Sequence, residues 1–248
     1  MTALLDASGV TVQFGALTAL DDVDLAVEPG QLVGLIGPNG AGKTTFVDAV
    51  TGFTPCQGAV RLAGRDITKL PPHRRARAGL ARTWQSVELF DDLTVAENLS
   101  ALAHRASLFD LFWPKRARDD DVVLGALTAI GVDHLAGRMP GELSHGQRTL
   151  VGVARALVTA PSVVCMDEPA AGLDTTESAA LGQCIRKVVD GGTSVLLIDH
   201  DMNLVLGVCD EIYVVDFGRV ITHGRPEDVR NDPRVVEAYL GASHEGAR

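Results

Sequence analysis

The residues with the clearest chemistry form a glycine-rich loop that ends in a lysine and a threonine. It fits the pattern G-x-x-x-x-G-K-[ST], in which glycines let several backbone N–H groups converge on one anion. Lys43 is placed to reach the β- and γ-phosphates of a nucleotide, and the Thr44 hydroxyl to ligate Mg²⁺. We call this segment the glycine loop and expect all of its residues to contact the nucleotide: Gly37, Pro38, Asn39, Gly40, Ala41, Gly42, Lys43, Thr44 and Thr45.

The segments on either side of the glycine loop are those that a phosphate site needs. Residues 32–36 are short, apolar and strand-like, and residues 45–50 can open a helix. The N-terminal end of that helix would add its positive dipole to the anion site. A glycine-rich turn that matched by chance would need neither element, so the context favours a phosphate-binding loop.

Two carboxylates follow a second apolar run. Residues 163–166 read Val-Val-Cys-Met, and Asp167 and Glu168 come directly after them. Open α/β sheets bind their ligands at the carboxyl ends of the strands. We expect Asp167 to hold Mg²⁺ through the water shell of the ion, and Glu168 to act as general base on an attacking water. Alone, such a pair is more typical of a solvated strand end. The glycine loop upstream makes the catalytic interpretation the favoured one.

Apolar runs and helical segments alternate after residue 160. Residues 163–166 and 195–198 are fully apolar, and residues 176–189 between them have helical spacing. Short apolar strands that alternate with helices are typical of a parallel sheet covered on both faces.

Other parts of the chain have different patterns. Residues 4–27 alternate as β-strands do, residues 212–224 predict a hairpin, and residues 95–157 are helical. We therefore predict one α/β domain over residues 1–248. It should have a mostly parallel core sheet, an antiparallel β subdomain and a helical subdomain inserted at approximately residues 95–160.

Composition excludes some classes of protein. Hydrophobic residues make up 46 % of the chain and aromatic residues 4 %, so the core should consist mainly of aliphatic side chains. The formal net charge of −10 argues against nucleic-acid binding, which favours a basic face. The four cysteines are scattered, which is typical of buried thiols in a reducing compartment. We expect no signal peptide and no transmembrane segment.

A segment in the middle of the chain resembles a family signature. Residues 143–147 read Leu-Ser-His-Gly-Gln and precede an amphipathic helix. The segment is similar to the Leu-Ser-Gly-Gly-Gln signature of the ATP-binding cassette (ABC) family, with His145 in place of the first glycine. Taken alone, the segment is better explained as an ordinary helix start capped by Ser144. Its position a short way before Asp167 favours the signature.

The remaining marks of that family follow in order. Gln85 resembles the glutamine of the family's glutamine loop, and residues 172–174 resemble its D-loop. His200 follows an apolar strand, as the family's switch histidine does. Phe14 lies where the family places an aromatic side chain that stacks on adenine.

The resemblance implies a P-loop NTPase fold, an ATPase activity and the cofactors ATP and Mg²⁺. Two such subunits, identical or different, would sandwich ATP between the glycine loop of one and the signature of the other. The resemblance then implies catalytic roles for Glu168, His200 and Gln85. It assigns nucleotide contacts to Phe14, Ser144, Gly146, Gln147 and Asp174, and metal contacts to Thr44, Gln85 and Asp167.

Within the family, residues 78–85, 89–99 and 232–241 look most like the ATPases of branched-chain amino acid importers. The ATPases of urea importers and of lipopolysaccharide export share much of this pattern, so cargo and direction of transport stay open. The implied partners are transmembrane permease subunits and a separate substrate-binding protein, with this chain on the cytoplasmic side of the membrane. Soluble ABC ATPases usually carry a coiled-coil arm or a second cassette, and this sequence has neither.

The stretch Leu108–Arg116 is apolar, then aromatic, then basic. It could contact the membrane partner or pack inside the helical insertion. We favour packing, because the stretch is too short for a convincing amphipathic face.

Overall fold

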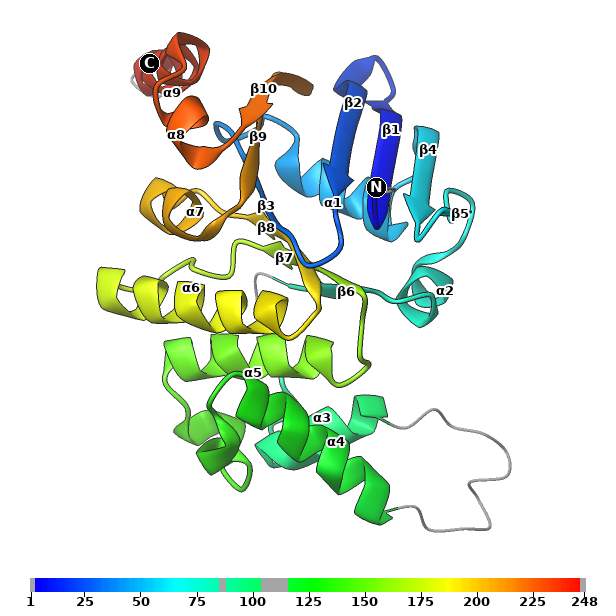
Figure 1. Ribbon diagram of the computed structural model, residues 1–248, viewed down its shortest axis with the longest axis vertical. Coiled ribbons are helices and arrows are strands. Elements are labelled where there is room, and N and C mark those ends of the chain that lie inside the picture. The colour runs from blue at the N-terminus through cyan, green and yellow to red at the C-terminus, as the bar shows by residue number, and fades with distance from the viewer. Residues whose placement is uncertain (1–2, 85–87, 104–115, 246–248) are drawn as a thin grey trace.

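A mixed sheet of parallel strands with one antiparallel edge forms the centre of the computed structural model, which describes residues 3–84, 88–103 and 116–245 (Figure 1). Its strands are β3 (Leu32–Ile36), β6 (Leu80–Thr83), β7 (Val163–Asp167), β8 (Ser194–Ile198), β9 (Glu211–Asp216) and β10 (Arg219–Gly224). The order is β10-β9-β3-β8-β7-β6, and each neighbouring pair is parallel except β9 with β10. Strands β3, β7 and β8 are buried throughout, because both faces of the sheet are covered.

A second, antiparallel sheet covers one face together with a helix. Its strands, in the order β2-β1-β4-β5, are β1 (Leu5–Phe14), β2 (Leu17–Val27), β4 (Gln57–Leu62) and β5 (Arg65–Asp66). Helix α1 (Lys43–Thr51) lies between this sheet and the central one (Figure 1). Phe46 is fully buried there, in the same core cluster as Val163 and Cys165 of β7.

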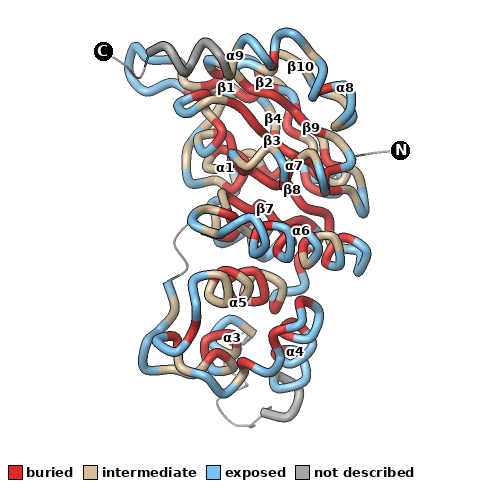
Figure 2. The backbone as a smooth tube through the Cα atoms, turned by 90° about the vertical axis from the view of Figure 1, so that its left-hand side faces the viewer, coloured by how far each residue is buried: buried red, intermediate tan, exposed pale blue. Residues whose placement is uncertain are grey.

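Helices cover the opposite face of the central sheet. Figure 2 shows buried residues along α6 (Thr175–Asp190) and α5 (His145–Leu157), with α3 (Val95–Ala103) and α4 (Arg116–Ala129) beyond them. Val164 and Met166 of β7 belong to the core cluster on this side. The remaining helical elements are α2 (Pro72–Arg77), η2 (Asp133–Leu135), η3 (Pro140–Glu142), α7 (Met202–Val208), α8 (Pro226–Arg230) and α9 (Pro233–Glu245).

The predicted fold class is confirmed: a mostly parallel core sheet, an antiparallel sheet and a group of helices between β6 and β7. The predicted hairpin is also present, with Phe217 and Gly218 at its turn between β9 and β10. All four cysteines are free thiols, and Cys165 and Cys209 are buried as expected, whereas Cys56 and Cys184 are only half-buried. In the described part of the chain, no helix has both the length and the apolar character that crossing a membrane requires.

Candidate functional site

The glycine loop runs from the end of β3 to the start of α1, and its conformation depends on glycine. Gly40 and Gly42 have φ angles of +80° and +105°, in the left-handed region that favours glycine. A Cβ atom on Gly37 would lie 2.0 Å from the carbonyl oxygen of Val215, and one on Gly42 would lie 2.8 Å from that of Ala19. The loop therefore approaches neighbouring backbone too closely for side chains at these positions.

Lys43 folds back into the glycine loop. Its Nζ atom donates hydrogen bonds to the carbonyl oxygens of Gly37 at 2.7 Å and Pro38 at 2.9 Å. Burial lowers the pKa of Lys43, and the carboxylates of Glu168 and Asp167 act in the opposite direction. The structure thus brings the predicted lysine and the two predicted carboxylates into one electrostatic environment.

The two carboxylates stand where β7 ends. Asp167 is buried, and its Oδ2 atom accepts a hydrogen bond from Nη2 of Arg82 at 2.8 Å. Glu168 has a φ angle of +47°, which is uncommon for a non-glycine residue. Its N–H donates to the carbonyl oxygen of Ile198 at 2.7 Å. Strained residues of this kind cluster at functional sites.

His200 follows the neighbouring strand β8 and lies beside Glu168. Its Nδ1 atom is 3.7 Å from Oε2 of Glu168 and 3.7 Å from Oδ1 of Asp199. Asp199 is fully buried, and its Oδ2 atom accepts a hydrogen bond from the N–H of Ala170 at 3.0 Å. Sequence reasoning missed Asp199, which joins the end of β8 to the segment after Glu168.

The signature segment forms the start of α5. Oγ of Ser144 accepts from the N–H of Gln147 at 3.2 Å, and Oε1 of Gln147 accepts from the N–H of Ser144 at 3.0 Å. This reciprocal capping box fixes the first turn of the helix. A Cβ atom on Gly146 would lie 3.1 Å from Oε1 of Glu177, so this glycine sits closely against α6.

His145 points back toward the predicted D-loop of its own chain. Its Nε2 atom lies 2.9 Å from the carbonyl oxygen of Ala171. A carbonyl oxygen only accepts, so Nε2 carries the proton in this contact. The contact explains how the position tolerates a side chain where the family usually has glycine.

Asp174, the last residue of the predicted D-loop, caps α6. Its Oδ1 atom accepts from the N–H groups of Thr176 and Glu177, both at 2.8 Å. The described hydrogen bonds of Ser144, Gln147 and Asp174 therefore stay within their own helix starts.

The remaining predicted residues are exposed or half-buried, or lie outside the described residues. Phe14 is at the end of β1, opposite Leu17 of β2, and is 54 % exposed. Thr44 is exposed in the first turn of α1, and Thr45 is half-buried. Gln85 and residues 108–115 lie outside the described residues.

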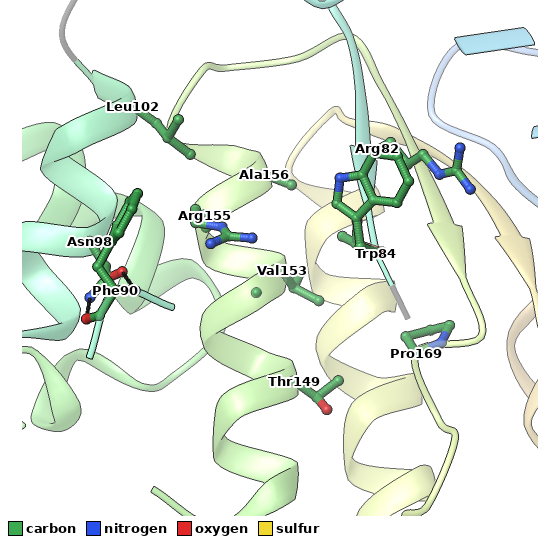
Figure 3. Close-up of a pocket in the computed structure, with 12 residues that line it drawn as sticks. Arg82, Trp84, Phe90, Asn98, Leu102, Thr149, Val153, Arg155, Ala156 and Pro169 are labelled. Carbon is green, nitrogen blue, oxygen red and sulfur yellow. Dashed lines mark hydrogen bonds between the residues drawn. The ribbon is translucent and has the colours of Figure 1, made fainter. Parts of the chain in front are cut away.

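A groove of about 320 Å³ is lined by residues of β6, α3 and α5 and of the segments that adjoin them (Figure 3). Trp84 and Pro169 form one side, and Pro169 directly follows Glu168 in the chain. Phe90 and Leu102, exposed by 62 % and 48 %, lie on the other side. Buried Asn98 holds the backbone of Phe90, accepting from its N–H at 2.8 Å and donating to its carbonyl oxygen at 3.1 Å.

Known proteins are similar to this chain over nearly its whole length. Residues 20–171 match the family described as ABC transporter, and residues 219–245 match the family described as branched-chain amino acid ATP-binding cassette transporter. The chain is 41 % identical to the high-affinity branched-chain amino acid transport ATP-binding protein BraF of Pseudomonas aeruginosa, over 96 % of this chain and 98 % of that protein. It is 40 % identical to LivG of Escherichia coli K12, a protein of the same description, with the same coverage of both chains.

Solved structures of ATP-binding cassettes have the same fold. A nucleotide-free cassette from an ABC transporter is 33 % identical, with a TM-score of 0.85 over 96 % of this chain and 99 % of that one. A cassette in its ADP conformation is 32 % identical, with a TM-score of 0.85 over 97 % of this chain and 100 % of that one.

Proposed function

Because this chain belongs to the ABC transporter family, we propose that it is the ATP-hydrolysing subunit of a membrane importer for branched-chain amino acids. The observation that carries the chemistry is the meeting of Lys43, Glu168 and His200 at one edge of the central sheet. The cargo is inferred from BraF and LivG, whose names state branched-chain amino acid transport.

In this proposal, the glycine loop holds the phosphates of ATP. Lys43 exchanges the carbonyl oxygens of Gly37 and Pro38 for phosphate oxygens, to which its charge binds more strongly. The first N–H groups of α1 add to the attraction. Phe14, exposed at the end of β1, is proposed to stack on the adenine ring.

Mg²⁺ fits the oxygen donors at this edge. Thr44 offers a hydroxyl and Asp167 a carboxylate, which are the hard ligands that Mg²⁺ prefers, and Gln85 is proposed as a further one. Among the described residues, no group of three or more His, Cys, Asp or Glu side chains could hold a metal ion. The metal would therefore share its coordination with phosphate oxygens and water. When bound, Mg²⁺ neutralises charge that develops on those phosphate oxygens.

Glu168 is proposed to accept the proton of the attacking water. The backbone N–H of Glu168 donates a hydrogen bond to the carbonyl oxygen of Ile198, and this bond holds the residue in place. His200, with a side chain that is 58 % exposed and lies beside Glu168, is proposed to contact the γ-phosphate. Buried Asp199 would fix the position of His200 relative to the segment after Glu168.

A second ATP-binding subunit, identical or different, is proposed to complete the site. Ser144, Gly146, Gln147 and Asp174 would face the nucleotide held by that partner. The start of α5 carries N–H groups and the positive end of a helix dipole, which favour an anion such as the γ-phosphate. ATP binding would then close the dimer, and hydrolysis would reset it.

The groove is proposed to receive the permease on the cytoplasmic side of the membrane. Its exposed aromatic side chains, Trp84 and Phe90, suit an apolar contact, and Gln85 directly follows Trp84. A separate substrate-binding protein would deliver the amino acid to the permease. The net charge of −10 argues against a role in nucleic-acid binding.

Uptake measurements test this proposal. Cells that lack this chain should lose uptake of labelled leucine, isoleucine and valine and keep uptake of urea. The wild-type gene should restore uptake, whereas the Glu168→Gln variant should not. Unchanged amino acid uptake together with lost urea uptake would contradict the proposed cargo and leave the ATPase assignment intact.

A further inference from the structure

A buried arginine connects the glycine-loop helix to the end of β7. Arg82 lies on β6, and its side chain is only 6 % exposed. Its Nη2 atom donates to Oδ2 of Asp167 at 2.8 Å, and its Nη1 atom donates to Oδ1 of Asp48 at 2.5 Å. Asp48 belongs to α1, the helix that begins at Lys43. One guanidinium is thus shared by two carboxylates from different elements.

The same guanidinium contacts two aromatic rings. Its Cζ atom lies 4.2 Å from the ring centroid of Trp84 and 5.8 Å from that of Phe53, within the range of cation–π attraction. The two rings meet edge to face, with centroids 5.0 Å apart. Arg82 and Trp84 also line the groove described above (Figure 3). A displacement of the guanidinium would therefore change the contacts of Trp84, an aromatic residue of the groove.

This arrangement is not what folding stability alone would favour. Nε of Arg82 is buried and has no hydrogen-bond partner among the described residues. Buried donors without an acceptor are rare and destabilising. Buried ion pairs, in addition, are often no more stable than well-packed apolar residues. A role in the activity would account for such a residue beside Asp167.

We propose that Arg82 is a positioning residue that couples Mg²⁺ binding at Asp167 to the position of Trp84 and so to the groove. The inference rests on the proposed function, because it takes Asp167 as a carboxylate that holds the metal. Without metal, Arg82 divides its two Nη groups between Asp167 and Asp48. Mg²⁺ competes with Arg82 for Asp167, so the guanidinium of Arg82 shifts toward Asp48. Because the ring of Trp84 is stacked on that guanidinium, the environment of Trp84 changes.

The energetic requirement for this coupling is met by the geometry. A ligand shifts a conformational equilibrium only if it interacts differently with the two states. Mg²⁺ would bind one of the two carboxylates that share the guanidinium and leave the other unaffected. Arg82 can retain a charge-assisted hydrogen bond in both states, which keeps the difference between them small enough for a ligand to change.

Tryptophan fluorescence tests the coupling. The chain has two tryptophans, so a Trp113→Phe parent leaves Trp84 as the sole emitter. Its emission is recorded with a non-hydrolysable ATP analogue, first with EDTA and then with Mg²⁺. We expect a Mg²⁺-dependent change in the parent. Arg82→Lys should abolish that change while nucleotide binding persists, because lysine keeps the charge but lacks the planar fork that spans two carboxylates.

A matched control uses a second arginine that is shared by two carboxylates. Arg186 on α6 lies 2.8 Å from Asp210 and 3.8 Å from Asp190. Arg186→Lys should keep the full Mg²⁺-dependent response of Trp84. The melting temperatures of Arg82→Lys and Arg186→Lys are compared, with the side chain of Arg186 being more exposed, at 38 % against 6 % for Arg82.

A second variant leaves Arg82 intact. Asp48→Asn removes the second carboxylate that holds Arg82, so Arg82 stays with Asp167. Mg²⁺ must then displace Arg82 from Asp167 without Asp48 as an alternative partner for the guanidinium. The Mg²⁺ concentration at half of the emission change should then rise by at least about threefold, since a charge-assisted partner for Arg82 has been lost. The affinity for the analogue in EDTA should stay unchanged.

Three results would overturn the inference. The parent could bind the analogue without a Mg²⁺-dependent change in emission, or Arg82→Lys could keep that change. Both variants could also lower the melting temperature and leave the Mg²⁺ dependence unaltered, which would make Arg82 purely structural. If the parent fails to bind the nucleotide at all, the proposed function fails, and the inference fails with it.

Discussion

Nε2 of His145 lies 2.9 Å from the carbonyl oxygen of Ala171, which joins the start of α5 to the segment between Glu168 and α6. His145 stands where the ABC signature usually has glycine, so this chain has a link that the usual signature cannot make. A Cβ atom on Gly172 would lie 3.2 Å from the same Nε2 atom, which shows how closely the two segments approach. The link would fix the signature and the D-loop relative to each other before a second subunit binds.

Replacement of His145 tests whether this link supports dimer formation. In a Glu168→Gln background, His145→Phe should weaken ATP-driven dimerisation about fivefold, because one hydrogen bond contributes about 1 kcal/mol. His145→Gln retains a donor and should dimerise nearly as well as the parent. Sedimentation equilibrium at several protein concentrations measures the constants. Equal values for the two variants would show that the contact does not contribute.

Lys43→Ala should remove tight ATP binding. A hydrogen bond to a charged group contributes about 1.5–3 kcal/mol, so losing the ammonium should weaken affinity by at least about tenfold. Titration calorimetry with ATP measures this. Lys187→Ala, at an exposed position of α6, is the control and should bind normally. Normal affinity of the Lys43 variant would exclude the glycine loop as the phosphate site.

Phe14→Ala should weaken binding of ATP and GTP alike. Stacking of a base on an aromatic ring contributes roughly 1–3 kcal/mol and depends little on which base is stacked. Leu17→Ala is a matched control, because Leu17 pairs with Phe14 across the hairpin and is 66 % exposed. Unchanged affinity of the Phe14 variant for both nucleotides would show that Phe14 does not contact the base.

The cysteines should react with iodoacetamide in two groups at pH 8. Burial raises the pKa of all four thiols, that of Cys165 to about 12, and Cys165 and Cys209 are the two that are buried rather than half-buried. A raised pKa means less thiolate at a given pH, and the thiolate is the reactive form. Peptide mapping of the native protein should find label on the half-buried Cys56 and Cys184 and none on Cys165 or Cys209 until it is unfolded. Rapid labelling of native Cys165 would contradict the burial of β7.

The parts of the fold that were predictable from the sequence depend on local patterns. The glycine loop and the apolar run before Asp167 carry their signals within a few consecutive residues. Strand β6 has four residues, of which only Leu80 is large and apolar, so its existence depends on pairing with β7. Helices α8 and α9 were likewise not predicted.

Contacts between distant segments were not accessible to sequence reasoning. Arg82 is 34 residues from Asp48 and 85 residues from Asp167 in the chain, and no local pattern predicts such pairs. His145 was identified as a departure from the signature, but its contact with Ala171 depends on how the start of α5 lies against the segment between Glu168 and α6. Buried Asp199 reads in the sequence as an ordinary residue after a strand.

The turnover of Glu168→Gln tests most directly the claim that this sheet edge hydrolyses ATP. The purified variant should bind ATP and hydrolyse it at least about a hundredfold more slowly than the wild type, since loss of a general base typically reduces the rate by 10²–10⁴. Glu227→Gln, at an exposed position on α8, should hydrolyse ATP at the wild-type rate. Near-normal hydrolysis by Glu168→Gln would contradict the account.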